Sequence, residues 1–124
     1  MNYLVSTMLL ALAFIHLLPL VGVLGGEPLS RLYGLRFEEP NLSILMRHRA
    51  VLFGLLGAFL ALSAFQPSMY AIGLIAAFVS VASFVLLAQL EGGYNSHIRT
   101  VLWVDLAGLA CVAIGGIALL YSQR

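Results

Sequence analysis

Four apolar stretches, each close to the length of a bilayer-spanning helix, take up most of this chain and constrain its fold more than any other feature. They cover residues 3–24, 42–65, 69–90 and 98–121. A helix of about 20 residues crosses a hydrocarbon core about 30 Å thick. Lipid offers no partners to backbone N–H and C=O groups, so segments that cross it are expected to be helical. We therefore predict an all-α fold in which residues 1–124 form a single domain, a bundle of four transmembrane helices.

The composition agrees with a membrane protein and excludes several other classes. Of 124 residues, 62% are hydrophobic and 9% are charged, whereas soluble domains are about 25% charged. A formal net charge of +1 provides no basic surface for nucleic acid, which is therefore not an expected partner. The single cysteine, Cys111, excludes an intrachain disulfide and a cysteine zinc cluster, and we interpret it as a small packing residue. The apolar amino-terminal run lacks the basic segment and cleavage site of a signal peptide, so it is interpreted as a true span.

The connections between the spans are unequal. Residues 66–68 form a short hairpin, which makes the second and third spans antiparallel neighbours. Residues 25–41 form the one sizeable polar loop, whose apolar positions recur as in a short amphipathic helix at the membrane interface. Those positions are Leu29, Leu32, Tyr33, Leu35 and Phe37. Five of the six arginines lie at the end with loops one and three, so the positive-inside rule predicts that both loops are cytoplasmic.

Local signals mark the helix ends and the packing faces. Gly92 and Gly93 are suited to ending a helix, and Asn95 is suited to capping the next one. Glu38 and Glu39 place negative charge near the amino end of the second span. Helices in lipid associate through small residues, and each span offers some of them. In the second span these residues are Ala50, Gly54 and Ala58 at four-residue steps, with Gly57 and Ala61 alongside.

Helical geometry directs three ionisable side chains from three spans towards the interior. Arg47 lies seven and eleven residues before Gly54 and Ala58, so at about 100° per residue it points along that face. His16 and Asp105 each lie about 10–12 Å below the same membrane face, at about 1.5 Å per residue. Ionisable groups within a bilayer usually face the bundle interior or a wet cavity. We expect a polar site here, with Arg47 and Asp105 in direct or water-mediated contact.

Other polar residues at this end extend the candidate site. The candidate ligand-binding residues are His16, Arg47, His48, Asn95 and Asp105. Arg49 is rotated about 200° from Arg47, towards lipid, and with Arg99 it is a candidate contact for lipid headgroups. Ser83, Gln89 and His97 are expected near the mouth.

Each main candidate also has a purely structural interpretation. Arg47 and Arg49 fit interfacial anchors at the start of a long helix. Asp105 fits the buried partner of an arginine, and His16 fits a hydrogen-bonded packing residue.

Motifs for metals and cofactors are missing from the sequence. It contains no HExxH, CxxC or paired ExxH motif, so no metal site is predicted. His16 and His48 are out of line with one another for binding a haem between them. No glycine-rich phosphate loop is present, and the broken helices of secondary transporters are also missing. We predict no cofactor.

Several runs of the sequence carry a resemblance to a known group. These are Ile15-His16-Leu17-Leu18-Pro19, the segment from Pro40 to Gly54 with its Arg47-His48-Arg49 core, and Gly93-Tyr94-Asn95 followed by Asp105. Over essentially its full length the chain resembles small four-helix bacterial membrane proteins of unassigned function. Some members carry the name phosphopantetheine adenylyltransferase, but such an enzyme has an HxGH motif that this sequence lacks.

The resemblance has consequences for the site and for its location. The family's recurring polar positions coincide with the five candidate ligand-binding residues, which implies a site there without naming a ligand. It also implies a multi-pass protein of the bacterial inner membrane. A weaker similarity is to four-helix membrane enzymes that use glutathione, which also carry arginines near the start of the second span. The Arg-His-Arg-Ala run here does not reproduce their fuller Asn/Glu pattern.

Two classes of function remain open from the sequence. The first is a small membrane protein that binds an anionic or amphipathic lipid-like ligand at one membrane face, or serves as an accessory subunit. Its expected partners are membrane lipids and either a second copy of the chain or another membrane protein. The second is an intramembrane enzyme acting on a lipid-like or thiol-conjugated substrate, with His16 or Asp105 as the acid-base group. A water-accessible cavity that reaches both residues distinguishes a site from a closed structural bundle.

Overall fold

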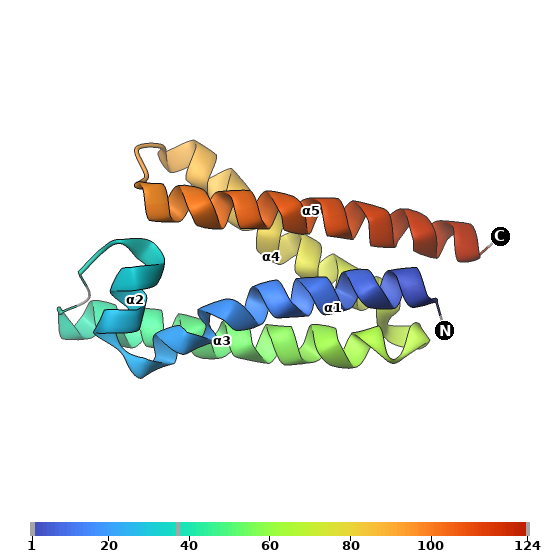
Figure 1. The fold of residues 1–124 in the computed structure, drawn as a ribbon, viewed down its shortest axis with the longest axis horizontal. Coiled ribbons are helices and arrows are strands. Elements are labelled where there is room, and N and C mark those ends of the chain that lie inside the picture. Colours follow the sequence, from blue (N-terminus) through green and yellow to red (C-terminus); the bar gives the residue numbers. More distant parts are fainter. Residues whose placement is uncertain (1, 37, 124) are drawn as a thin grey trace.

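The structure, a computed structural model, describes residues 2–36 and 38–123, and within these ranges it is helical without strands (Figure 1). The elements in chain order are α1 (Tyr3–Leu17), the 3-10 helix η1 (Leu18–Leu24), α2 (Gly26–Tyr33), α3 (Pro40–Ala64), the 3-10 turn η2 (Pro67–Met69), α4 (Tyr70–Glu91) and α5 (Ser96–Ser122). The predicted all-α bundle is confirmed.

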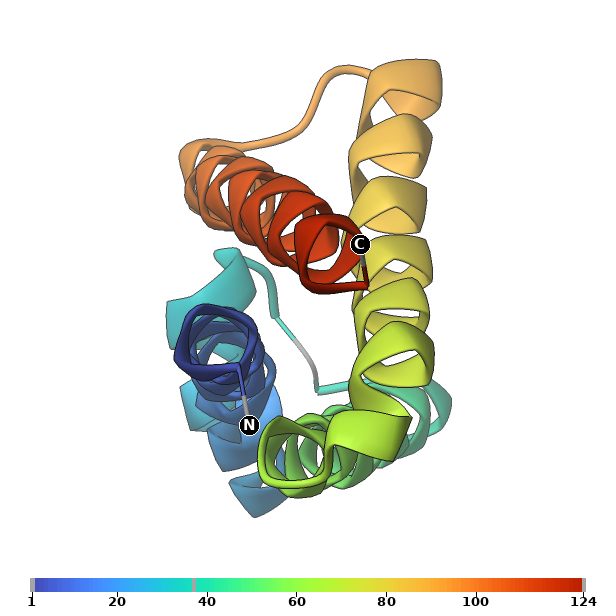
Figure 2. The same cartoon turned by 90° about the vertical axis from the view of Figure 1, so that its right-hand side faces the viewer.

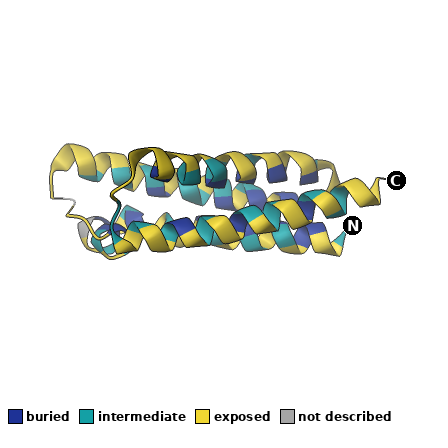
Figure 3. Cartoon of the chain, turned by 90° about the horizontal axis from the view of Figure 1, so that it is seen from above, coloured by how far each residue is buried: buried dark blue, intermediate teal, exposed yellow. Residues whose placement is uncertain are grey.

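The described part of the chain contains four helical segments long and apolar enough to cross a membrane. They are Tyr3–Leu24, Pro40–Ala64, Pro67–Glu91 and Ser96–Ser122, which agree with the predicted spans to within a few residues. The first span tightens into η1 at Pro19, whose ring nitrogen has no hydrogen to donate to the preceding turn. Figure 3 shows which faces of the helices are exposed, and large apolar side chains lie on them, such as Leu55 and Trp103, which are 62% and 67% exposed. Such a surface suits lipid rather than water.

The helices form a bundle in which α1 contacts each of the three other long helices. α1 packs against α3 and α5, and α4 packs mainly against α5. α3 and α4 meet at their hairpin and diverge from it, as Figure 2 shows. Both chain ends lie at the hairpin end, while α2 and the α4–α5 connection lie at the opposite end (Figure 1). The predicted antiparallel neighbours are therefore joined closely at one end only.

Small residues set the closest helix approach, and on α3 the predicted Ala50 and Gly57 are among them, whereas Ala58 is not. A Cβ on Gly57 would lie 2.7 Å from the Leu17 side chain and 3.2 Å from the carbonyl oxygen of Ala13, so α1 needs a glycine there. Ala50, Gly57, Leu60 and Ala64 are buried on this face. Ala58, which we expected to share the packing face, is exposed. The inward face of α3 is therefore rotated away from the predicted one.

The predicted helix ends agree with the structure. The Asn95 side chain caps α5 by accepting a hydrogen bond from the backbone N–H of Ile98 at 2.8 Å. Gly92, with a φ of 65°, ends α4. The Glu39 carboxylate caps α3 by accepting from the backbone N–H groups of Asn41 and Leu42. These two hydrogen bonds, the Leu42 one first, hold the pKa of Glu39 below its ordinary value.

The polar loop contains the expected amphipathic helix in a shortened form. α2 ends at Gly34, whose φ of 67° is left-handed, so Leu35 lies outside the helix and is exposed. Phe37 lies outside the described residues. Leu29 and Tyr33 of α2 are buried against α3 and α5. The loop helix thus packs onto the bundle and forms no separate domain.

Candidate functional site

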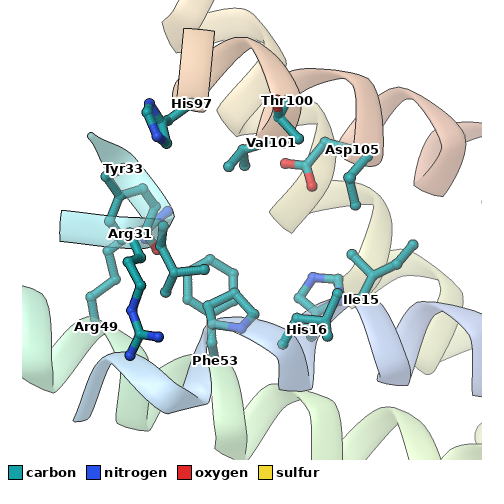
Figure 4. A pocket seen from close by; sticks show the side chains of 14 residues that line it. Ile15, His16, Arg31, Tyr33, Arg49, Phe53, His97, Thr100, Val101 and Asp105 are labelled. Carbon is teal, nitrogen blue, oxygen red and sulfur yellow. The ribbon is translucent and has the colours of Figure 1, made fainter. Parts of the chain in front are cut away.

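A cavity of about 290 Å³ lies at the end of the bundle that carries α2. Residues from α1, η1, α2, α3 and α5 line it, and Figure 4 shows its polar side chains. The lining residues that carry polar atoms on their side chains are His16, Arg31, Tyr33, Arg49, His97, Thr100 and Asp105. The walls are otherwise mostly aliphatic, with the ring of Phe53 among them. This volume is at the lower end of the range for small-molecule sites, which is about 300–1,000 Å³.

Arg49 is the basic side chain most firmly held in the cavity. Its guanidinium donates a hydrogen bond to the hydroxyl of Tyr33. Its Cζ lies 4.5 Å from the centroid of the Phe53 ring and 5.2 Å from that of Tyr33. Cations over aromatic faces at such distances are attracted by the ring electrons. These contacts fix the guanidinium on the cavity wall, with part of its fork-shaped donor set open to a ligand.

Asp105 lies on α5 and is half-buried, with its carboxylate directed into the cavity (Figure 4). Among the described residues no ion pair and no hydrogen bond reaches that carboxylate. A carboxylate at this depth in a bilayer is costly without a partner. The cavity therefore presents an unsatisfied hydrogen-bonding group to whatever enters it.

His16 is 1% exposed and uses both ring nitrogens within the bundle. Its Nδ1 lies 2.7 Å from the carbonyl oxygen of Leu12, which only accepts hydrogen bonds, so Nδ1 carries the proton and donates it. In the neutral ring Nε2 then accepts from the hydroxyl of Ser80 at 2.8 Å. The ring also lies 5.8 Å from that of Phe53. His16 thus joins α1 to α4 and supports the cavity wall.

Asn95 joins the two loops and lies outside the cavity lining, although it was a candidate ligand-binding residue. While its side-chain oxygen caps α5, its Nδ2 donates a hydrogen bond to the carbonyl oxygen of Tyr33 at 2.8 Å. Gly34 lies beside it, and a Cβ there would come within 2.5 Å of Nδ1 of His97. The carboxyl end of α2 is therefore held against the amino end of α5, which places Tyr33 over Arg49.

The expected direct contact between Arg47 and Asp105 is not made in the described structure. Nε of Arg47 donates to the carbonyl oxygen of Val23 at 2.8 Å, and Arg47 does not line the cavity. Arg49, which we expected to face lipid, lies in the cavity with Asp105. Helical phase explains why the two arginines take each other's expected positions. Arg47 points in the same direction as Ala58, eleven residues further along the helix, whereas Arg49 points in the same direction as Leu60.

Burial decides which of these two faces is inward. Leu60 is 0% exposed while Ala58 is exposed, so a direction aligned with Leu60 points into the bundle. Both faces of α3 carry small residues, and the one with Ala50 and Gly57 is the face that α1 contacts.

The other candidates divide between the cavity and the surface. His16 and Asp105 line the same cavity, as their predicted depth requires, and His97 lies at its mouth. His48 and Arg99 are exposed, and neither lines the cavity. Ser83 and Gln89, expected at the mouth, are also outside the lining. The ligand-binding role of His48 and the lipid-headgroup contact of Arg99 stay predictions.

Sequence reasoning missed several lining residues. Arg31 and Tyr33 lie on α2, and the amphipathic pattern of the loop was the signal that this helix docks. Phe53 follows Arg49 by one helical turn, a spacing at which an aromatic ring and a cation on the same face meet.

The described residues hold no group of three or more His, Cys, Asp or Glu side chains placed to bind a metal ion. Comparison of the chain with protein-family models, with curated proteins and with solved structures gives no match. The fold and the site geometry are accordingly what the functional argument rests on.

Proposed function

We propose that this chain is a small integral protein of the bacterial inner membrane that binds an anionic amphiphile at the membrane face where loops one and three lie. It acts alone or as an accessory subunit. The anionic group binds at Arg49, and the apolar part of the ligand contacts the aliphatic walls.

The observation that carries this proposal is the fixed guanidinium of Arg49 on the wall of a mostly apolar cavity. Arginine pairs with phosphates and carboxylates through parallel hydrogen bonds. Arg31 and His97 line the same cavity and add basic groups. With a volume of about 290 Å³, the cavity suits a headgroup and the start of a chain rather than a whole diacyl lipid.

Native mass spectrometry of protein released from a mild detergent tests this function. We expect lysophosphatidylglycerol, which has one chain and an anionic headgroup, to bind with one-to-one stoichiometry. Arg49→Met should weaken binding about tenfold, which is about 1.4 kcal/mol. Arg36→Met is the matched control, because Arg36 is an exposed arginine at the same end and outside the cavity. Equal loss in both variants, or in neither, contradicts the proposal.

The enzyme alternative has one observation in its favour, a carboxylate in a cavity, that of Asp105, which makes no hydrogen bond or ion pair among the described residues. His16 is less suited to acid-base chemistry because both of its nitrogens are engaged within the bundle. Conversion of the bound lysolipid to a species of different mass during incubation, lost in Asp105→Asn, would favour the enzyme. Retention of the ligand unchanged favours the binding protein.

A further inference from the structure

The cavity carries charge of both signs on separate walls. Arg49 lies on α3 and Asp105 on α5, and both side chains line the same space (Figure 4). Although they carry opposite charges, no ion pair joins them in the described structure. A cation and an anion that share an apolar cavity normally attract each other strongly. The lack of a direct contact needs a structural reason.

The contacts of Arg49 supply that reason. The Tyr33 hydroxyl accepts a hydrogen bond from the guanidinium, and the rings of Phe53 and Tyr33 lie against it. Tyr33 is itself fixed, because Asn95 donates to its carbonyl oxygen and its side chain is buried. Moving the guanidinium across to Asp105 would break these interactions together. The cavity therefore keeps its two charges apart before any ligand binds.

Such a separation is complementary to a ligand that has its own two charges in the opposite order. Its anionic group meets Arg49, and a donor group reaches Asp105. An ammonium that carries hydrogens satisfies the carboxylate by a charge-assisted hydrogen bond. A headgroup that is only anionic offers the carboxylate no positive charge, and its phosphate would also be repelled by it.

We propose that the ligand is a zwitterionic amphiphile, an inference that rests on the proposed function. Its phosphate or carboxylate binds Arg49, and its primary ammonium binds Asp105. The selectivity for this headgroup comes from two fixed side chains of opposite charge, Arg49 and Asp105. A quaternary ammonium has no N–H to donate, and the rings that could attract it are occupied by Arg49. The chain thus prefers an ethanolamine-like headgroup to glycerol-like or choline-like ones.

The test compares three lysophospholipids that share one acyl chain. Lysophosphatidylethanolamine, lysophosphatidylglycerol and lysophosphatidylcholine are titrated separately into the detergent-solubilised full chain and counted as adducts by native mass spectrometry. We expect the ethanolamine lipid to bind about tenfold more tightly than either of the others. Asp105→Asn, which is nearly isosteric and removes only the charge, should abolish the preference over the glycerol headgroup. Glu91→Gln, an exposed acid at the same end of the bundle and outside the cavity, should keep it.

The outcomes separate this inference from the function on which it rests. Equal or tighter binding of the glycerol lipid, still dependent on Arg49, overturns the zwitterion and leaves the anionic-amphiphile function standing. Equal or tighter binding of the choline lipid overturns the inference that Asp105 binds a primary ammonium. Binding of none of the three lipids, with both variants folded, overturns inference and function together. The last measurement adds free O-phosphoethanolamine as a competitor. If it competes as strongly as lysophosphatidylethanolamine does, the same two side chains recognise a soluble zwitterion rather than a lipid.

Discussion

At the residue scale, His16 shows how a polar group is accommodated in an apolar helix. The carbonyl of Leu12 fixes the proton on Nδ1, and the hydroxyl of Ser80 satisfies Nε2. Both structural and ligand-binding interpretations of His16 were open from the sequence. The two hydrogen bonds support the structural one, in which the histidine positions the cavity wall.

Replacing Ser80 tests that role. Ser80→Ala leaves Nε2 of His16 without its donor, and we expect a loss of about 1 kcal/mol in stability, since hydrogen bonds between membrane helices average about 0.6 kcal/mol and an unsatisfied buried group costs about 1–3 kcal/mol. Ser83→Ala is the control, because the Ser83 hydroxyl donates to the Ser80 carbonyl within its own helix. Unfolding in detergent by added sodium dodecyl sulfate measures both. A loss as large in Ser83→Ala as in Ser80→Ala argues against the interhelical bond.

The two arginines of α3 differ in their coupling to Asp105. Because Arg47 binds the carbonyl of Val23 and lies outside the cavity, Arg47→Met and Asp105→Leu should be additive within about 0.3–0.5 kcal/mol. Arg49→Met and Asp105→Leu share the cavity and should show a larger interaction energy. Two double-mutant cycles on thermal stability in detergent measure this. Coupling of Arg47 but not Arg49 would restore the sequence-based expectation.

At the element scale, the Glu39 cap makes the start of α3 sensitive to pH. The folded-state pKa of Glu39 is lowered by the N–H groups of Leu42 and Asn41, so the cap contributes stability above the unfolded-state pKa. That contribution is lost as the pH falls through the folded-state pKa. Wild type should therefore be more stable than Glu39→Gln at pH 7, and the difference should vanish in acid. Thermal unfolding across this pH range measures it, and a difference that grows in acid would be the contrary result.

The docking of α2 depends on one asparagine. Asn95→Ser keeps an oxygen to cap α5 but loses the donor to the Tyr33 carbonyl, whereas Asn95→Ala loses both interactions. We expect faster amide exchange in α2 for both variants, by roughly five- to tenfold for a lost contact of about 1 kcal/mol. Exchange in the first turn of α5 should rise only in Asn95→Ala. Hydrogen–deuterium exchange by mass spectrometry resolves the two helices, and unchanged α2 protection in both variants would contradict the docking role.

At the scale of the whole molecule, the bundle has two unlike ends. The hairpin end holds both chain ends, and the opposite end holds α2, the α4–α5 connection and the cavity (Figure 1). An arrangement that crosses the membrane four times places loops one and three on one side. Single cysteines at Arg31 and Tyr94, in a Cys111→Ala background, should react with an impermeant maleimide from the same side. The Gln66 position should react from the other side, and labelling of all three from one side would contradict four crossings.

The sequence by itself determined the number of spans, their lengths and their ends. Length and apolarity against a fixed hydrocarbon thickness are properties of each segment alone. Caps such as Glu39 and Asn95 act on backbone groups two or three residues away, and Gly92 ends a helix by its own conformational freedom. Rules that act over only a few residues of the chain can be applied without knowing where the neighbouring helices lie.

Only the tertiary structure decided which face of α3 is inward and which arginine shares a cavity with Asp105. Small residues occur on two faces of that helix, and sequence periodicity gives them equal weight. The choice depends on where the Leu17 side chain and the Ala13 carbonyl of α1 meet Gly57. The cavity itself exists because α2 docks across α3 and α5 and carries Tyr33 over Arg49. Contacts between segments distant in sequence set these features, so the pattern within one segment could not predict them.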